Sequence, residues 1–287
     1  MPDSVFINGK YICAKGAALS IFSPGFLYGD GVFETLKSCS KEIIFFDEHI
    51  DRLFSSLREL KYSYSFDREH IKSAILKLIA KNRLNNCNAA IKIIVSRRNY
   101  IDKFRIDFWA EPDLIITAKK IANYQKDIYK KGLIIISSSI RRNPCSNFLY
   151  KHKLLNYFEN IYAKNEAYAA GADEALFITR DKTVLECASS NIFLVKNGSI
   201  ITPALTQNIL PGITRQNVIN ICKKNNINII QKKVHYFEIM EADEIFITNS
   251  ISDIMPVKMV DSHTIAKCNI PGKATELVSV LYRQACL

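Results

Sequence analysis

The sequence predicts an α+β fold in two domains. Residues 1–120 alternate segments of strand type with segments of helical type, and a hairpin signal lies near the start. Residues 132–287 hold many short apolar segments of strand type and few of helical type. Between them, residues 121–131 are polar and show no clear period, so they are predicted to be a linker. We therefore expect a small N-terminal domain and a larger C-terminal domain.

The elements expected in the first domain follow from turn signals and apolar spacing. Asn8-Gly9 between two short apolar segments predicts a β-hairpin. Asp47 is expected to cap a helix at about 48–61, in which apolar residues recur at helical spacing. The other elements expected here are a strand at 32–36 with a partner at 43–46, a second helix around 71–79, and strands at 90–95 and 114–117.

The second domain is predicted in the same way. A helix over Leu154–Ala170 should stop at Gly171, a residue typical of helix ends. Asn197-Gly198 predicts another hairpin. The other elements expected here are strands at 133–136, 174–178, 191–195, 199–202 and 244–248, a helix at 214–224, and a loop through Pro256.

Composition excludes several classes of protein. The 287 residues are 48% hydrophobic and 23% charged, which is ordinary for a folded protein. No apolar run is long enough to span a membrane and the start lacks a signal peptide, so we expect a cytoplasmic protein without a membrane partner. The net charge of +11 comes with scattered lysines and no nucleic-acid-binding signature, so an anionic substrate explains part of it better than nucleic acid. The eight cysteines neither pair as Cys-x-x-Cys nor cluster with histidines, so we expect no metal site.

Lys153 and Glu186 are the first candidates for chemistry. A lysine amine can form a Schiff base with pyridoxal 5′-phosphate (PLP), and a carboxylate can keep the pyridine nitrogen protonated. Such a lysine must be partly desolvated, which the neighbouring Leu154-Leu155 permits. Taken alone, a solvated lysine and an exposed strand end remain the commoner outcomes.

A phosphate group could be bound at two further places. Leu210–Arg215 is a sharp turn entering a helix, where free N–H groups and the Thr214 hydroxyl could hold an anion. Thr248-Asn249-Ser250 could add another contact, and Arg52 lies beside the apolar stripe of its helix, from which it could reach a cleft. A plain polar loop and a surface arginine are the alternatives.

Together these segments resemble the class IV aminotransferases, the fold-type IV PLP enzymes, over nearly the whole chain. Six ordered matches are specific, whereas any one of them alone would be weak. The matches are Tyr28–Thr35, His49–Leu53, Lys153 with Asn156, Glu186–Phe193, Leu210–Arg215 and Thr248–Ser250. Asn156, three residues after Lys153, selects Lys153 over Lys151.

The resemblance implies a two-domain fold like that of D-amino acid aminotransferase, with PLP in the interdomain cleft and its lysine carried by the larger C-terminal domain, and a homodimer. It implies that Lys153 binds PLP and then, as the catalytic residue, moves the proton at Cα. The cofactor-binding residues that it implies are Lys153, Glu186, Arg52, Ile213, Thr214, Ser250, Asn191 and Tyr157.

Local differences within the family bear on the reaction. After Val95 the chain lacks the Arg-x-His pair of D-amino acid aminotransferases, and Phe33–Lys37 departs from the branched-chain pattern. Arg142-Asn143-Pro144 and Ile254–Val257 are similar to lyases of the group. We therefore expect 4-amino-4-deoxychorismate lyase, which releases pyruvate and forms 4-aminobenzoate for folate synthesis. The alternative is a branched-chain or D-amino acid aminotransferase; either substrate is a small amino compound with carboxylates.

Overall fold

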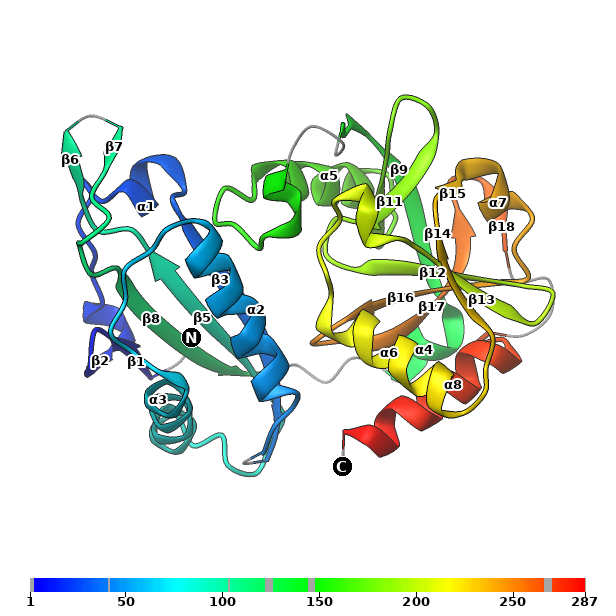
Figure 1. Ribbon diagram of the computed structural model, residues 1–287. Coiled ribbons are helices and arrows are strands. Elements are labelled where there is room, and N and C mark those ends of the chain that lie inside the picture. The colour runs from blue at the N-terminus through cyan, green and yellow to red at the C-terminus, as the bar shows by residue number, and fades with distance from the viewer. Residues whose placement is uncertain are drawn as a thin grey trace. The chain divides into compact units, whose positions relative to one another are not determined.

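The computed structural model describes residues 3–40, 42–102, 104–121, 126–143, 148–265 and 270–286. The chain divides into two compact units. Unit 1 comprises residues 1–122 and 152–157, and unit 2 comprises residues 123–151 and 158–287. Each unit combines a large sheet with helices (Figure 1), which confirms the predicted α+β class. The expectation that the larger C-terminal domain carries the lysine needs correction. Lys153 belongs to unit 1, because backbone hydrogen bonds join its segment to Gly31 and Phe33, although both flanks of the segment belong to unit 2.

Unit 1 is built on a six-stranded antiparallel sheet in the order β2-β1-β8-β5-β3-β4. Its strands are β1 (Ser4–Ile7), β2 (Lys10–Cys13), β3 (Gly31–Cys39), β4 (Glu42–Ile43), β5 (Ala89–Ser96) and β8 (Asp113–Lys120). The strands β6 (Tyr100–Asp102) and β7 (Arg105–Ile106) form a separate hairpin. Its helices are α1 (Pro24–Tyr28), α2 (Phe46–Glu59) and α3 (Arg68–Lys81), with a short 3-10 turn at Ala14–Gly16.

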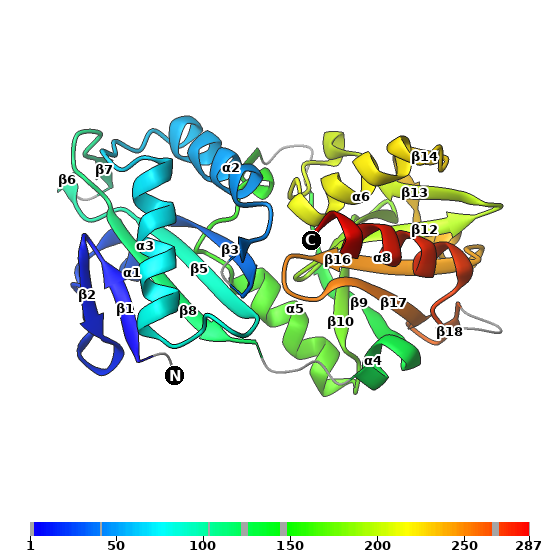
Figure 2. The same cartoon turned by 90° about the horizontal axis from the view of Figure 1, so that it is seen from below.

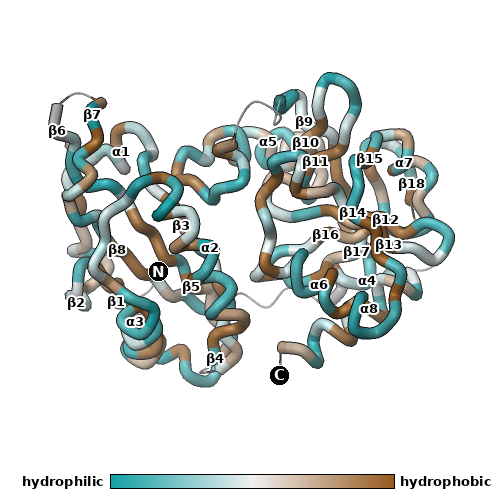
Figure 3. The backbone as a smooth tube through the Cα atoms, viewed as in Figure 1, coloured by the Kyte–Doolittle hydropathy of each residue, from teal (hydrophilic) through white to brown (hydrophobic). Residues whose placement is uncertain are grey.

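Helices α2 and α3 cover one face of this sheet (Figures 1 and 2). Every second residue of β5 from Ala89 to Val95 is fully buried, which is the period of a strand with one face on the core. Figure 3 shows the resulting hydrophobic stretch along β5 and another along β12 (Asn191–Lys196) of unit 2. Burial of this apolar surface is the main stabilising term for the unit.

The start of unit 1 follows the sequence prediction, but the start of α2 does not. Asn8 and Gly9 both have positive φ, 48° and 85°, as a two-residue hairpin turn requires. Asp47 is not the cap of α2: the helix begins at Phe46 after Phe45, which has a left-handed conformation with φ 51°. The predicted partner strand at 43–46 is accordingly short, because β4 ends at Ile43 and the Phe46 ring is buried in the core.

Unit 2 is built on a ten-stranded sheet in the order β14-β13-β12-β16-β17-β9-β10-β11-β15, with β18 also paired to β17. Its other strands are β9 (Leu133–Arg141), β10 (Glu174–Ile178), β11 (Thr183–Cys187), β13 (Ser199–Pro203), β14 (Ile229–Lys232), β15 (Val234–His235), β16 (Glu244–Asn249), β17 (Asp253–Val260) and β18 (His263–Thr264). Its helices are α4 (Lys126–Lys131), α5 (Phe158–Ala169), α6 (Ile213–Lys224), α7 (Tyr236–Met240) and α8 (Lys273–Ala285), with short 3-10 turns at Phe148–Lys151 and Leu205–Gln207.

The sheet of unit 2 has apolar clusters on both faces. Alternate residues of β10 enter different clusters, Leu176 and Ile178 one of them and Phe177 the other. Helix α5 packs on β9 and β10, and α6 and α8 lie side by side next to β16 (Figure 2). The predicted hairpin at Asn197-Gly198 and the glycine end of α5 at Gly171 (φ 70°) are confirmed.

Three expectations for this part of the chain need correction. Residues 126–131 of the expected linker form α4. Pro256 lies inside β17, opposite Phe246, instead of in a loop, because the residues around it are buried and their burial outweighs the missing N–H. Helix α5 begins at Phe158 and not at Leu154, since residues 153–155 pair with β3.

No helix within the described ranges is long and apolar enough to cross a membrane.

Candidate active site

Lys153 lies in an extended segment that β3 holds in place. The Phe33 amide donates to the Lys153 carbonyl (2.8 Å), and the Leu155 amide donates to the Gly31 carbonyl (2.9 Å). A Cβ atom on Gly31 would meet Leu155 Cδ1 at 2.3 Å, and one on Gly29 would meet the Asn156 amide nitrogen at 2.9 Å. Gly29, just before β3, and Gly31, its first residue, are therefore what lets this segment approach the sheet.

The Lys153 ammonium lies against aromatic rings. Its nitrogen is 4.6 Å from the Phe33 ring centre and 5.5 Å from the Tyr157 ring centre. The two rings meet edge to face, with centres 5.4 Å apart. The rings remove part of the water around the amine, and the side chain is half-buried. Partial desolvation is the condition that a Schiff-base lysine requires.

Arg52 of α2 is held by Glu34 of β3. Arg52 Nε donates to Glu34 Oε1 and Arg52 Nη2 donates to Glu34 Oε2, both at 2.7 Å. His49 Nδ1 donates to Glu34 Oε2 at 2.8 Å. Burial opposes the charge on Glu34, but the Arg52 charge and the hydrogen bonds from His49 and Arg52 outweigh it and lower the pKa of Glu34 to about 2.

The buried pair of Glu34 and His49, which supports Arg52, was not predicted from the sequence. Burial, above all, lowers the pKa of His49, and the charges of Arg52 and Lys153 act in the same direction. Glu34 and His49 are both almost fully buried. The signal was present in Val32-Phe33-Glu34-Thr35-Leu36, because a carboxylate inside an otherwise apolar strand needs partners.

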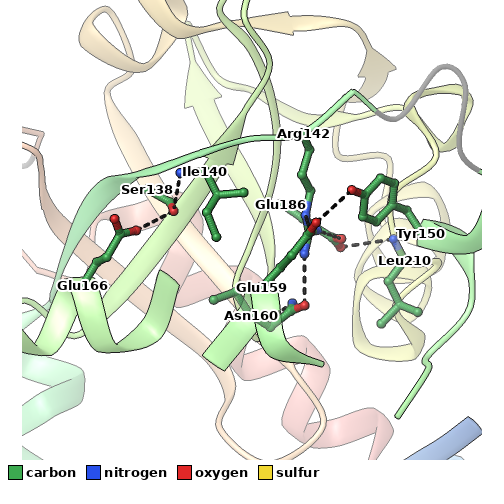
Figure 4. A network of polar contacts seen from close by, with 10 residues as sticks. Ser138, Ile140, Arg142, Tyr150, Glu159, Asn160, Glu166, Glu186 and Leu210 are labelled. Atoms are coloured by element: carbon green, nitrogen blue, oxygen red, sulfur yellow. Dashed lines mark hydrogen bonds and ion pairs between the residues drawn. The ribbon is translucent and has the colours of Figure 1, made fainter. Parts of the chain in front are cut away.

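Glu186 lies in unit 2, in the fully buried strand β11. An exposed strand end, the commoner outcome for this glutamate taken alone, is therefore not what the structure has. Glu186 Oε2 accepts from the Leu210 amide and Glu186 Oε1 accepts from Arg142 Nη1, both at 3.1 Å (Figure 4). Glu186 Oε2 also accepts from Asn191 Nδ2 at 3.5 Å. The carboxylate is thus approached by donors at both oxygens.

Asn191 links the turn before α6 to the Glu186 carboxylate. Asn191 Nδ2 donates to the Leu210 carbonyl at 3.1 Å, and a Cβ atom on Gly212 would lie 1.9 Å from Asn191 Oδ1. Gly212 is the N-terminal cap of α6 and brings no side-chain hydrogen bond. The first amides of a helix have no partner within the helix, so Ile213 and Thr214 present a place for an anion.

The segment Thr248–Ser250 lies beside Asn191. Asn191 pairs with Thr248 across β12 and β16, and Asn249 Nδ2 donates to Ser190 Oγ at 3.0 Å. Thr248 Oγ1 is buried with no hydrogen-bond partner among the residues that the structure describes. Such an orphaned hydroxyl marks a polar group that could serve a ligand.

The eight predicted cofactor residues fall into two groups. Unit 1 holds Arg52, Lys153 and Tyr157, and unit 2 holds Glu186, Asn191, Ile213, Thr214 and Ser250. Their chemistry fits PLP: an amine for its aldehyde, a buried carboxylate for its ring nitrogen, and a helix start with an arginine for its phosphate. In the described part of the chain, no three His, Cys, Asp or Glu side chains are placed to hold a metal ion.

The two groups hold the residue types that a PLP enzyme uses, a lysine in one and a buried carboxylate in the other. The profile of the family "Amino-transferase class IV" matches residues 31–260, and the chain belongs to this family. It is therefore an enzyme whose cofactor is PLP, as the resemblance implied.

Two relatives and one solved structure show how similar the chain is to known members. A putative branched-chain-amino-acid aminotransferase of Methanocaldococcus jannaschii is 33% identical over 91% of this chain and 89% of its own length. Aminodeoxychorismate lyase of Bacillus subtilis is 30% identical over 98% of this chain and 94% of its own length. The T.th. branched-chain amino acid aminotransferase, solved with pyridoxamine 5′-phosphate, has a TM-score of 0.91 and 26% identity, covering 100% of this chain and 95% of that one.

Proposed function

We propose that the protein is a 4-amino-4-deoxychorismate lyase, which converts its substrate into 4-aminobenzoate and pyruvate. The observation that carries this proposal concerns Lys92 of β5. Its ammonium nitrogen lies 4.3 Å from the centre of the Phe33 ring, the same ring that Lys153 contacts. No carboxylate among the described residues forms an ion pair with Lys92.

A half-buried ammonium without an acidic partner suits an anionic ligand. Burial, and to a smaller extent the charge of Lys119, lowers the pKa of Lys92, so a carboxylate bound there would relieve an electrostatic cost. Aminodeoxychorismate carries two carboxylates and no large aliphatic group. A substrate with this much negative charge explains Lys92 better than a branched-chain amino acid does.

Bound PLP supplies an electron sink for the carbon that carries the substrate amine. In the proposed reaction Lys153 takes the proton from that carbon as a general base. The ring C–O bond then breaks and the enolpyruvyl group, protonated at its methylene carbon, leaves as pyruvate. The remaining ring is aromatic 4-aminobenzoate, and this aromatisation drives the reaction.

We propose that cofactor residues of unit 1 and of unit 2 bind the same PLP molecule. Lys153 would bind its aldehyde and Glu186 would keep its ring nitrogen protonated. Its phosphate would be held by the side chains or amides of Arg52, Ile213, Thr214 and Ser250, with Asn191 and Tyr157 supporting the site. Asn191 supports this assignment because it joins Glu186 to the turn at Leu210.

The test is a product assay. The purified protein with PLP receives aminodeoxychorismate; 4-aminobenzoate is measured by chromatography and pyruvate by a coupled lactate dehydrogenase assay. Equal amounts of both products support the proposal, and Lys153→Ala is the inactive control. A yellow, PLP-loaded enzyme that forms neither product would disprove the lyase activity.

The alternative is an amino-acid aminotransferase of the branched-chain or D-amino acid type; the M. jannaschii relative, 33% identical, is named as a putative branched-chain aminotransferase. Here Lys153 would return the proton to the cofactor instead of leaving the carbon deprotonated. Single L- or D-amino acids should then change the absorbance of the bound cofactor in a half-reaction, and a panel without any response would exclude this function. A colourless protein that takes up no PLP would indicate a non-catalytic relative.

We also propose that the protein is a homodimer, as the resemblance implies. Unit 1 exposes large apolar side chains in two segments, around α1 and on both sides of β7. They are Ile21, Phe22, Phe26, Leu27, Tyr28, Phe104, Phe108 and Trp109, with Phe22 78% and Trp109 88% exposed. The Tyr28 ring joins the segments by an edge contact with Phe104 at 5.2 Å. An exposed apolar patch of this kind is typical of a protein interface, and light scattering coupled to gel filtration measures the expected dimer.

A further inference from the structure

Arg142, which directly follows β9, donates hydrogen bonds from all three nitrogens of its guanidinium group, one of them to Glu186. Its Nη1 donates to Glu186 Oε1 (3.1 Å), its Nε to Glu159 Oε2 (3.0 Å) and its Nη2 to Asn160 Oδ1 (3.0 Å). Figure 4 shows these side chains converging on the guanidinium from β11 and α5. The side chain is only 5% exposed.

Aromatic rings and α5 hold the guanidinium rigidly. Its central carbon lies 3.5 Å from the Phe177 ring centre and 4.8 Å from the Tyr150 ring centre. Asn160 also donates to the Ala188 carbonyl at 2.7 Å, which ties α5 to the residues just after Glu186. Arg142 therefore cannot turn away from Glu186 without losing stacking and hydrogen bonds together.

The ion pair with Arg142 sets the charge and the orientation with which Glu186 could bind a ring nitrogen. A buried carboxylate loses its hydration, and a guanidinium in contact with it favours the charged form. Arg142 contacts one oxygen and the Leu210 amide contacts the other, so the carboxylate plane is fixed. A charged carboxylate of fixed orientation leaves the proton on the pyridine nitrogen, whereas a more basic one would take it.

We propose that Arg142 is a positioning residue that keeps Glu186 charged and oriented toward the pyridine nitrogen of PLP. This inference rests on the proposed role of Glu186 and applies to lyase and aminotransferase chemistry alike. The competing explanation is purely structural: Arg142 would only attach α5 to β9 through Glu159 and Asn160.

The experiment compares Arg142→Met, Arg142→Lys and Glu159→Gln as PLP-loaded proteins. Glu159→Gln is the matched control, because it removes the charge of a neighbour of Arg142 that is 44% exposed and leaves the ion pair with Glu186 intact. The readouts are the absorbance spectrum of the bound cofactor from pH 5 to pH 9, the dissociation constant for PLP, and the midpoint of thermal unfolding.

In Arg142→Met the carboxylate should take up a proton at higher pH than in the wild type. The acid-side change of the cofactor spectrum should then move up by about one pH unit, and PLP binding should weaken about tenfold. Arg142→Lys should restore part of the shift, and Glu159→Gln should keep the wild-type spectrum. If the spectrum of Arg142→Met titrates like the wild type, or if Glu159→Gln shifts it equally, the positioning role is wrong.

If Arg142→Met folds poorly, a comparison made in the Glu186→Gln variant still tests the inference. Adding Arg142→Lys to Glu186→Gln should change PLP binding less than it does in the wild type, because the residue acts through Glu186. Equal changes in both backgrounds would overturn the inference. A wild-type protein that binds no PLP would instead refute the proposed function, so the two failures are distinguishable.

Discussion

The Glu34 carboxylate meets Arg52 edge to edge, with two hydrogen bonds of 2.7 Å. This geometry fixes the plane of the guanidinium as well as its position. Since Arg52 is the predicted phosphate-binding residue of unit 1, Glu34 sets the direction from which the arginine can meet a phosphate. His49 occupies the same carboxylate oxygen as Arg52 Nη2 and keeps Glu34 from turning.

Replacing Glu34 by Gln should loosen Arg52. The amide loses the charge that offsets the buried guanidinium, and breaking one side of a buried pair costs about 3–5 kcal/mol. We expect a lower thermal midpoint and weaker PLP binding, measured by calorimetry and by fluorescence titration. The exposed Glu48→Gln in the first turn of the same helix is the control and should change neither.

Stability should fall on acidification in two stages. The pKa of buried His49 is lowered from 6.5, so the unfolded chain binds a proton that the folded chain refuses, and stability declines as the pH falls through about 6.5. The pKa of Glu34 is lowered from 4.5 to about 2, so its contribution of about 3 kcal/mol is present above pH 4.5 and is lost as the pH falls toward 2. Urea unfolding at several pH values measures both stages. A His49→Asn variant that keeps the full loss between pH 7 and pH 5.5 would contradict the first.

Lys153→Ala should abolish turnover and the covalent attachment of PLP while the fold persists. The backbone bonds of the segment to Phe33 and Gly31 do not involve the side chain, so β3 still holds it. Borohydride reduction followed by mass spectrometry should find a phosphopyridoxyl group in the wild type and none in the variant. Lys151→Ala is the matched control and should be labelled like the wild type.

Gly31→Ala should disturb the segment that carries Lys153. The new methyl group would meet Leu155 Cδ1 at 2.3 Å and the Val95 carbonyl oxygen at 2.8 Å, and the backbone of β5 at Val95 cannot give way cheaply. We expect a loss of about 1–3 kcal/mol in unfolding free energy, together with a lower rate of PLP attachment. Gly16→Ala meets nothing within 4 Å and should behave like the wild type, so an equal effect of both changes would be inconsistent with this account.

Lys92→Met should raise KM for the acidic substrate with little effect on PLP binding. Losing a charge-assisted contact to a carboxylate corresponds to roughly tenfold or more in affinity. Steady-state kinetics and PLP titration separate the two quantities. Lys120→Met, at the exposed end of β8, is the control. An unchanged KM would remove the structural support for a substrate rich in carboxylates.

Local signals predicted much of the fold. Asn8-Gly9 and Asn197-Gly198 confirm that turn chemistry can be read from two residues, since both need positive φ. The errors came from interactions distant in sequence. Residues 154–157 have the composition of a helix start, yet pairing with β3 keeps them extended. Pro256 reads as a loop residue, but the burial of its neighbours in the sheet of unit 2 decides otherwise.

The residues of the candidate site could be predicted only in part, because some of their contacts are also distant in sequence. Motifs predict Lys153 and Glu186 as site residues, because their chemical types and order are those of the family pattern. They could not identify Arg142 as the partner of Glu186, because the two residues are 44 positions apart and only the arrangement of β9, α5 and β11 joins them. Lys92 was also missed, because a lysine in a strand gives no sign of whether an acid faces it.

The assignment of residues 152–157 to unit 1 has a consequence for how the protein can be divided. The chain leaves unit 1 after residue 122, returns for six residues and leaves again. A fragment ending at residue 122 would keep its helices and sheet but would leave the Gly31 carbonyl and the Phe33 amide without their partners. The two units are therefore not interchangeable modules. Domain exchange with a relative would have to carry this short return segment along with the N-terminal part, because Lys153, the proposed Schiff-base lysine, lies in it.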